Sequence, residues 1–163
     1  MAVTRIKILK KLTEYISDNV QFFNLHSASK TIRFKFCLDC APVTSMAFAA
    51  LLPFTRAFLH ARVSGQEIWI NDAPPLDIIQ ENASVFTEPG DVVFGPLKPT
   101  RTKTSGCLRI YYGEGRGLDC CNIFAKVFED DLGLLKALGD NIWKYGVQEI
   151  TFDHPGYTGA GSD

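Results

Sequence analysis

The sequence lacks the features that mark a membrane-spanning, secreted or nucleic-acid-binding protein. Its 17 lysines and arginines nearly balance its 18 aspartates and glutamates, for a net charge of −1. Polyanionic partners are recognised by clustered positive charge, so we expect neither a nucleic acid nor a membrane as partner. No apolar run approaches the roughly 20 residues of a membrane span. Lysines interrupt the apolar stretches of the N-terminal segment, which is unlike a signal peptide.

Histidine is scarce, with three residues in the chain. His26, His60 and His154 have no spacing typical of metal ligands. Cys120 and Cys121 are adjacent, so on a strand their side chains would face opposite ways rather than share one ion. We therefore expect no metal and no other cofactor.

The five cysteines are an odd number for a protein built on disulfides. We expect a cytoplasmic protein whose reducing compartment keeps them as thiols. Cys37 and Cys40 form a CxxC motif where a predicted strand meets a predicted helix, and a helix N-terminus lowers a thiol pKa. The alternating strand before the motif differs from the buried parallel strand of thioredoxin-type proteins. The pattern therefore favours no redox role and leaves the question open.

The length of 163 residues suits one domain. Apolar residues at every third or fourth position over 5–23 predict an amphipathic helix. The polar segment 24–29 is interpreted as a linker. Alternating apolar and charged residues over 31–36 predict a half-buried strand.

Two further helices are predicted. One has Asp39 as a candidate cap and Pro42 in its first turn, and Pro53 ends it. The other has a helical spacing of apolar residues over 130–143.

The sequence between these helices is rich in strand and turn patterns. Ser64-Gly65 predicts a hairpin turn. The glycine-rich segment 113–117 lacks the following helix that a phosphate-binding loop requires, so it is interpreted as a mobile hairpin loop. The predicted strands are 56–63, 67–70, 92–94, 106–112 and 122–129, with 147–152 after the last helix.

This order of elements predicts a mostly β protein with a few helices, in which a closed antiparallel β-barrel is capped by helices and preceded by an N-terminal helix. It is not the alternating pattern of a βαβ fold. We expect an N-terminal helical extension over 1–29, a barrel domain over 30–154 and a flexible tail over 155–163.

The segment 58–72, FLHARVSGQEIWIND, is the most informative part of the chain. Alternate residues of a strand share one face. In the strand before the turn, one face is aliphatic and is assigned to the barrel interior. The other face is expected to point outward or into a covered groove. The interior set is Leu59, Ala61 and Val63, and the outward set is Phe58, His60 and Arg62.

Pairing that keeps the apolar faces together places Glu67 and Trp69 beside His60 and Arg62. A carboxylate, an arginine, an imidazole and a flat aromatic wall suit the binding of an anion or an amide. The alternative is an exposed cross-strand ion pair, with the tryptophan packed under a helix or another subunit. Both stay open at this point.

Glu81 and Asn82 follow a long loop, and functional residues concentrate on loops held by rigid scaffolds. Glu81 is a candidate general base or a hydrogen-bond acceptor for a ligand amide. The alternative is that both residues cap local backbone groups.

Four segments carry a resemblance to a family of bacterial proteins of unknown function with a cyclophilin-like barrel. They are the hairpin from His60 to Trp69, the Glu81-Asn82 pair, the turn at 88–92 and the strand at 107–113. The resemblance covers about residues 30–152. It implies a closed, mostly antiparallel barrel capped by helices, and it implies no known activity.

The hairpin is also similar to that of true cyclophilins, the peptidyl-prolyl isomerases, but only Arg62 matches by position. Gln66 stands where the resemblance implies the phenylalanine of the proline pocket, and Trp69 stands where it implies a glutamine. Without that apolar wall, isomerase activity is the less favoured reading.

We expect binding of a small molecule or peptide in a groove formed by His60, Arg62, Trp69, Glu81 and Asn82, in a protein that self-associates through its apolar helices. The rival is an enzyme acting on an amide or cyclic amide, with Glu81 or His60 as base and Arg62 holding the developing oxyanion. A third class is a structural subunit whose hairpin face is buried between protomers.

Overall fold

The computed structural model describes residues 7, 10 and 21–155. Within this part the protein is mostly β with two helices, as predicted, and no helix there is long and apolar enough to cross a membrane. The elements are β1 (Phe22–Ser27), β2 (Lys30–Phe36), α2 (Pro42–Leu51), β3 (Phe54–His60), β4 (Gly65–Ile70), β5 (Ala83–Phe86), β6 (Asp91–Phe94), β7 (Leu108–Val127), a 3-10 turn (Glu129–Asp131), α3 (Leu132–Tyr145) and β8 (Gln148–Asp153). The predicted N-terminal helix lies largely outside the described residues.

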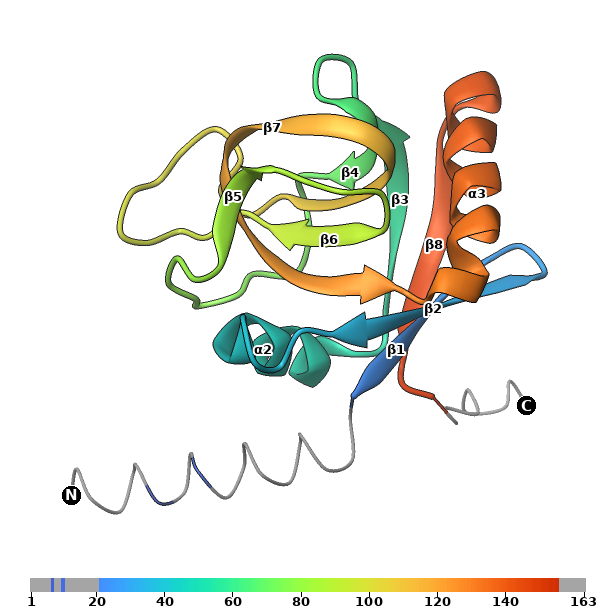
Figure 1. Ribbon diagram of the computed structural model, residues 1–163. Helices are drawn as coiled ribbons and strands as arrows, with labels where there is room; N and C mark the ends of the chain where they lie inside the picture. The colour runs from blue at the N-terminus through green and yellow to red at the C-terminus, as the bar shows by residue number, and fades with distance from the viewer. Residues whose placement is uncertain (1–6, 8–9, 11–20, 156–163) are drawn as a thin grey trace.

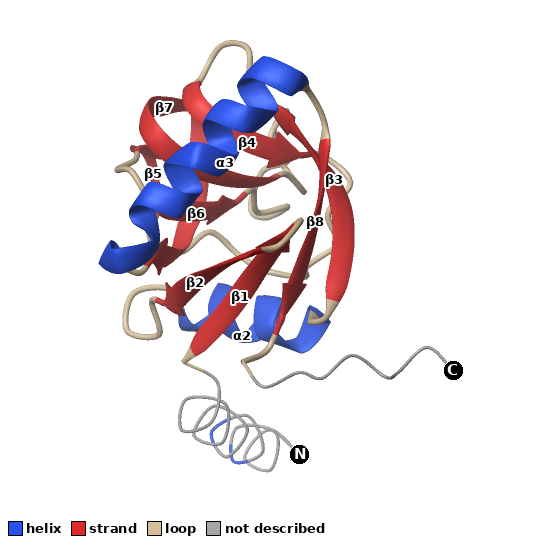
Figure 2. Ribbon diagram, turned by 90° about the vertical axis from the view of Figure 1, so that its right-hand side faces the viewer, coloured by secondary structure: helices blue, strands red, loops and turns tan. Residues whose placement is uncertain are grey.

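The strands form one antiparallel sheet in the order β2-β1-β8-β3-β4-β7-β5, with β6 paired to β7. Strand β2 also pairs with β7, so the path from β2 to β7 returns to its first strand. The strands curl around a common interior (Figure 1). Helix α3 packs on β2, β3, β4 and β7 (Figure 2). Helix α2 packs on β7.

The interior is filled by phenylalanines from strands that are distant in sequence. Phe48 of α2 is fully buried, and its ring centroid lies 5.0 Å from that of Phe124 and 5.1 Å from that of Phe23. Aromatic rings bury large apolar areas and favour tilted contacts of this kind. Helix α2 is therefore held against the sheet by one ring that contacts several strands.

Strand β7 runs unbroken for 20 residues, so the mobile loop predicted at 113–117 is wrong. Strand β6 pairs with both arms of β7, because Val92 is opposite Ile110 and also opposite Ala125. Gly115 pairs with Gly65, and a Cβ on Gly115 would lie 2.6 Å from the Ser64 carbonyl oxygen. The glycines let β7 pass close to the β3–β4 connection.

The linker predicted at 24–29 is also wrong, because most of it lies in β1. Leu25 is fully buried and pairs with Ile32 on one side and Phe152 on the other. The sheet thus begins at Phe22, before the predicted domain boundary at residue 30. The division into extension, domain and tail otherwise stays a prediction.

Cys37 and Cys40 are joined by a disulfide, so the expectation of thiols throughout is wrong for this pair. The turn between β2 and α2 brings their Cα atoms to 5.5 Å, within the usual range for a disulfide. Cys107, Cys120 and Cys121 are free.

Asp131 connects β2 to the start of α3. Its Oδ2 accepts hydrogen bonds from the backbone N–H and from Nε of Arg33, each at 2.8 Å, and its Oδ1 accepts one from Nη2 at 2.9 Å. These hydrogen bonds lower the pKa of Asp131 below its usual value, although burial opposes the shift.

We expect Asp131→Asn to lower the melting temperature at pH 7 by about 2–4 °C, because it removes a charged hydrogen-bond partner. A carboxyl group with a depressed pKa stabilises the fold above its unfolded pKa, and this contribution is lost as pH falls. The difference between variant and wild type should therefore shrink toward pH 2.5. Thermal melts by circular dichroism across this range measure it, with the exposed neighbour substitution Asp130→Asn as control. Equal effects of the two substitutions would contradict the assignment.

Candidate functional site

A pocket of about 430 Å³ lies beside the β3–β4 hairpin, within the size range of small-molecule sites. Its walls are residues 59–64, Trp69, Leu118 and the segment 103–107, of which Lys103, Thr104 and Cys107 line it. Glu67 and Arg109 are its most buried charged residues. We call this the hairpin pocket.

The hairpin faces are the reverse of the prediction for several residues. Phe58 is fully buried, with its ring centroid 5.7 Å from that of Phe152, whereas Leu59 is 42% exposed and Val63 is 74% exposed. The aromatic ring takes the interior position because it contacts the phenylalanine core. The interior placement of the isoleucines of β4 is confirmed.

Three of the predicted site residues line the hairpin pocket, namely His60, Arg62 and Trp69. Nδ1 of His60 lies 2.6 Å from the Ala61 carbonyl oxygen, to which it donates. Nε2 lies 2.7 Å from the Tyr112 hydroxyl, which donates to it when the ring is neutral. Both ring nitrogens are thus engaged, so the imidazole is held in place and has no free nitrogen to act as a base.

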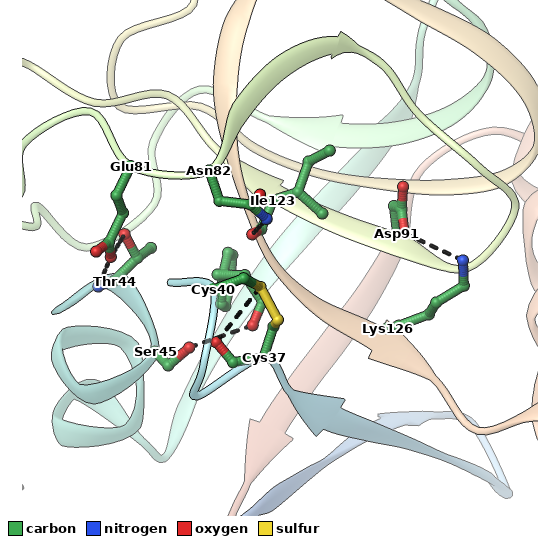
Figure 3. The surroundings of a disulfide bond; sticks show 10 residues. Cys37, Cys40, Thr44, Ser45, Glu81, Asn82, Asp91, Ile123 and Lys126 are labelled. Carbon is green, nitrogen blue, oxygen red and sulfur yellow. Dashed lines mark hydrogen bonds and ion pairs between the residues drawn. A yellow bond between two sulfur atoms is a disulfide. The ribbon is translucent and has the colours of Figure 1, made fainter. Parts of the chain in front are cut away.

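Glu81 and Asn82 do not line this pocket. Oε1 of Glu81 accepts hydrogen bonds from the backbone N–H of Thr44 at 2.5 Å and from its hydroxyl at 2.7 Å (Figure 3). This carboxylate caps α2 from a distant loop, in place of the predicted cap Asp39, and the residue before the helix makes no side-chain cap. Nδ2 of Asn82 donates to the Ile123 carbonyl oxygen at 2.8 Å.

Three buried polar side chains behind the hairpin were not predicted together as a site. Nε of Arg109 lies 3.6 Å from Oε1 of Glu67, and the two side chains are 5% and 2% exposed. Nη1 of Arg109 donates to the Tyr111 hydroxyl at 3.4 Å. The signal in the sequence is an arginine inside the otherwise apolar run 107–112, since a charge in such a strand needs a buried partner.

Burial and the neighbouring charges alter the acid–base properties of this group. Burial, together with the Glu67 carboxylate, raises the pKa of Tyr111 far above its usual value, so the hydroxyl stays neutral. Burial is the largest single influence on Arg109 and would lower its pKa, but Glu67, Cys121 and Tyr111 together outweigh it and raise this pKa. The hairpin pocket therefore has a permanent guanidinium charge behind it.

Glu67 has one unsatisfied acceptor. Its Oε2 is buried and accepts no hydrogen bond from any residue of the described part. A buried polar atom without a partner costs about 1–3 kcal/mol, and more when it is charged. Because Glu67 also lines the hairpin pocket, its carboxylate is a candidate partner for a hydrogen-bond donor that enters the pocket. Within residues 21–155, no group of three or more His, Cys, Asp or Glu side chains is arranged to hold a metal ion.

The chain belongs to the DUF3830 family, described as proteins of unknown function, whose profile matches residues 23–154. A search of curated proteins finds no significant match. The resemblance inferred from the hairpin and strand motifs, to a family of unknown function, is thereby confirmed.

Two solved structures, McbB and AF2241, share the fold at low sequence identity. McbB, in a structure with tryptophan, has a TM-score of 0.63 and 17% identity over 85% of this chain and 46% of its own, so this chain spans about half of McbB. The hypothetical protein AF2241 from Archaeoglobus fulgidus has a TM-score of 0.56 and 14% identity, covering 83% of this chain and 95% of its own. The Mimivirus cyclophilin has a TM-score of 0.46 and 12% identity, covering 81% and 85%.

We expect Arg109→Met to lower the free energy of unfolding by about 3–5 kcal/mol, because it leaves Glu67 buried without a counter-charge. The double variant Arg109→Met/Glu67→Leu should recover most of the loss, since it removes both charges. Urea denaturation of the two variants measures this difference. Equal destabilisation of the single and double variants would show that the ion pair is not what Arg109 contributes.

The raised pKa of Tyr111 predicts a loss of stability in alkali. An unfolded tyrosine loses its proton near pH 10, whereas Tyr111 in the folded protein keeps it to higher pH. The contribution of the neutral Tyr111 hydroxyl to the free energy of unfolding is therefore fully present below pH 10 and is lost as pH rises above it. We expect Tyr111→Phe to reduce the stability loss between pH 9 and pH 11 by about 1 kcal/mol. Urea denaturation at both pH values tests this, with the exposed Tyr145→Phe as control; an unchanged pH dependence in Tyr111→Phe would refute it.

Proposed function

We propose that this DUF3830 protein binds a small molecule in the hairpin pocket, through a hydrogen-bond donor on the ligand that meets Glu67. The observation that carries the proposal is the unpartnered Oε2 of Glu67, buried in a largely apolar pocket. Ligand sites typically combine apolar walls with a few polar groups that fix orientation.

The charges favour a ligand that is polar at both ends. An amide or ammonium N–H would satisfy Glu67, whose charge is held by Arg109. Arg62 and Lys103 are exposed where they line the pocket, and they suit a carboxylate or carbonyl oxygen at the other end of the ligand. Amino acids, small amides and the ends of peptides have this pattern.

The apolar walls of the hairpin pocket determine which chemistry suits the central part of the ligand. Leu59, Trp69 and Leu118 line the pocket with exposed or half-buried side chains. Covering them with a ligand would remove apolar area from water. An apolar or aromatic body between two polar ends therefore fits, and tryptophan, the ligand in the McbB structure, is a suitable first probe.

The enzymatic alternative finds less support. His60 has both ring nitrogens engaged, and Glu81 caps α2 instead of lining the pocket. The closed cyclophilin-like barrel is the scaffold that we infer, supported by the β2–β7 pairing. Self-association and a cytoplasmic location stay predictions.

The test is a binding screen with amino acids, N-acyl amides and short peptides, read by thermal shift and then by calorimetry. We expect Glu67→Gln to weaken binding by about 10- to 100-fold, because a hydrogen bond to a charged group contributes about 1.5–3 kcal/mol. Arg62→Ala should weaken carboxylate ligands more than amides. The control Glu114→Gln changes an exposed carboxylate outside the hairpin pocket and should leave affinity unchanged.

Equal affinity of wild type and Glu67→Gln would overturn the proposed role of this carboxylate. The structural-subunit alternative would be favoured by two results together. No compound in the screen would bind, and hydrogen exchange of the hairpin amides would slow as protein concentration rises.

A further inference from the structure

A second candidate site lies at the turn between β2 and α2, where Cys37 and Cys40 form the disulfide. Both cysteines are half-buried and line a cleft of about 580 Å³ that is separate from the hairpin pocket. We call it the disulfide cleft. We propose that this disulfide is a thiol–disulfide exchange site whose substrates are thiols and dithiols.

The turn is anchored by hydrogen bonds that do not depend on the disulfide. The backbone N–H of Cys37 donates to the Phe124 carbonyl oxygen at 2.8 Å, and the hydroxyl of Ser45 donates to the same oxygen at 3.2 Å. The backbone N–H of Ala41 donates to the Cys37 carbonyl oxygen at 2.9 Å. Figure 3 shows the pair between the start of α2 and strand β7. Reduction therefore leaves the two sulfurs close together and ready to re-form the bond.

The disulfide itself adds little to stability, since it links cysteines three residues apart. Stabilisation by a disulfide grows with the length of the loop that it closes, because a longer loop removes more entropy from the unfolded chain. A disulfide that closes a short loop, in a turn already anchored by hydrogen bonds, is suited to reversible reduction.

The disulfide cleft provides access and charge for an incoming thiolate. Lys35 lines it as an exposed cation, whereas Lys126 is held by Glu88 at 2.5 Å and Asp91 at 3.5 Å. Asp39 is the opposing negative charge in the turn itself. The thiolate is the attacking species in exchange, and nearby cations favour it.

Helix α2 determines which sulfur leaves. Pro42 is its first residue, so Cys40 lies two positions before the helix, next to the positive end of the helix dipole. Glu81 offsets part of this positive end through Thr44. A thiolate at Cys40 is favoured here over one at Cys37, which follows a strand.

The exchange then has two steps. A substrate thiolate attacks Sγ of Cys37, the S–S bond breaks, and its electron pair leaves on Sγ of Cys40, which takes up a proton. For a dithiol, the second substrate thiol attacks its own sulfur in the mixed disulfide and releases Cys37 as a thiol. The protein gains two electrons and two protons, and the substrate is oxidised to a disulfide.

The remaining cysteines give an internal comparison. Burial raises the pKa of the thiols of Cys107 and Cys121, which makes them poor nucleophiles. Cys120 is exposed and free, so it is the matched control for exchange by an ordinary surface thiol.

The experiment uses the full chain in the Cys120→Ser background and in wild type. After incubation with reduced and oxidised dithiothreitol at varied ratios, free thiols are alkylated and counted by mass spectrometry. We expect Cys37 and Cys40 to convert together and reversibly, with an unchanged circular dichroism spectrum. Resistance to excess dithiothreitol in the folded protein, or unfolding on reduction, would overturn the proposal.

Single-cysteine variants then test the order of events. With oxidised glutathione, Cys37→Ser should form a mixed disulfide at Cys40 at least about tenfold faster than Cys120 does in the Cys37→Ser/Cys40→Ser variant, because Cys40 has the larger thiolate fraction. Cys40→Ser, which leaves Cys37, should react more slowly than Cys37→Ser. Rates at both positions no faster than at Cys120 would show an ordinary disulfide with no exchange function.

Discussion

The long strand β7 is the element on which the rest of the structure depends. It pairs with β2, β4, β5 and β6, so the continuity of the sheet depends on its backbone hydrogen bonds. Alternate side chains of β7 also face two different environments, one apolar and one polar. Ile110 and Tyr112 point into the phenylalanine core, whereas Arg109 and Tyr111 point to the opposite face, where Tyr111 packs with Val93 and Cys121.

This division explains why a buried ion pair stands behind the hairpin pocket. Pairing of β4 with β7 places Glu67 opposite Tyr111 and Trp69 opposite Arg109, which brings the carboxylate and the guanidinium together on one face. Burying such a pair is seldom a gain over apolar packing, because both ions lose their hydration. Its place beside an apolar pocket is compatible with the ligand site that we propose.

The same strand holds the second site through its backbone rather than its side chains. The Phe124 carbonyl accepts both hydrogen bonds that fix the cysteine turn to the sheet. Asn122 adds a third link, since its Nδ2 donates to the Thr44 hydroxyl at 3.0 Å and so supports the residue that Glu81 caps. Glu81, which is attractive as a base in the sequence, is thus used to start α2. The two proposed sites share a scaffold but no lining residues.

Much of the fold was predictable because it follows from local patterns. Alternation predicted β2, helical spacing predicted α3, and Pro42 and Pro53 bracket α2 because proline has fixed positional preferences. The motif resemblance found the family, and His60, Arg62 and Trp69 do line one pocket.

What only the tertiary structure decided was the partner of each group. Phe58 rather than Leu59 points inward because it contacts Phe152 in the core. Residues 113–117 are part of a strand because they pair with Gly65 and β5. Arg109 forms an ion pair with Glu67 of the neighbouring strand. Such pairings join residues far apart in the chain, and no local pattern of polarity encodes them.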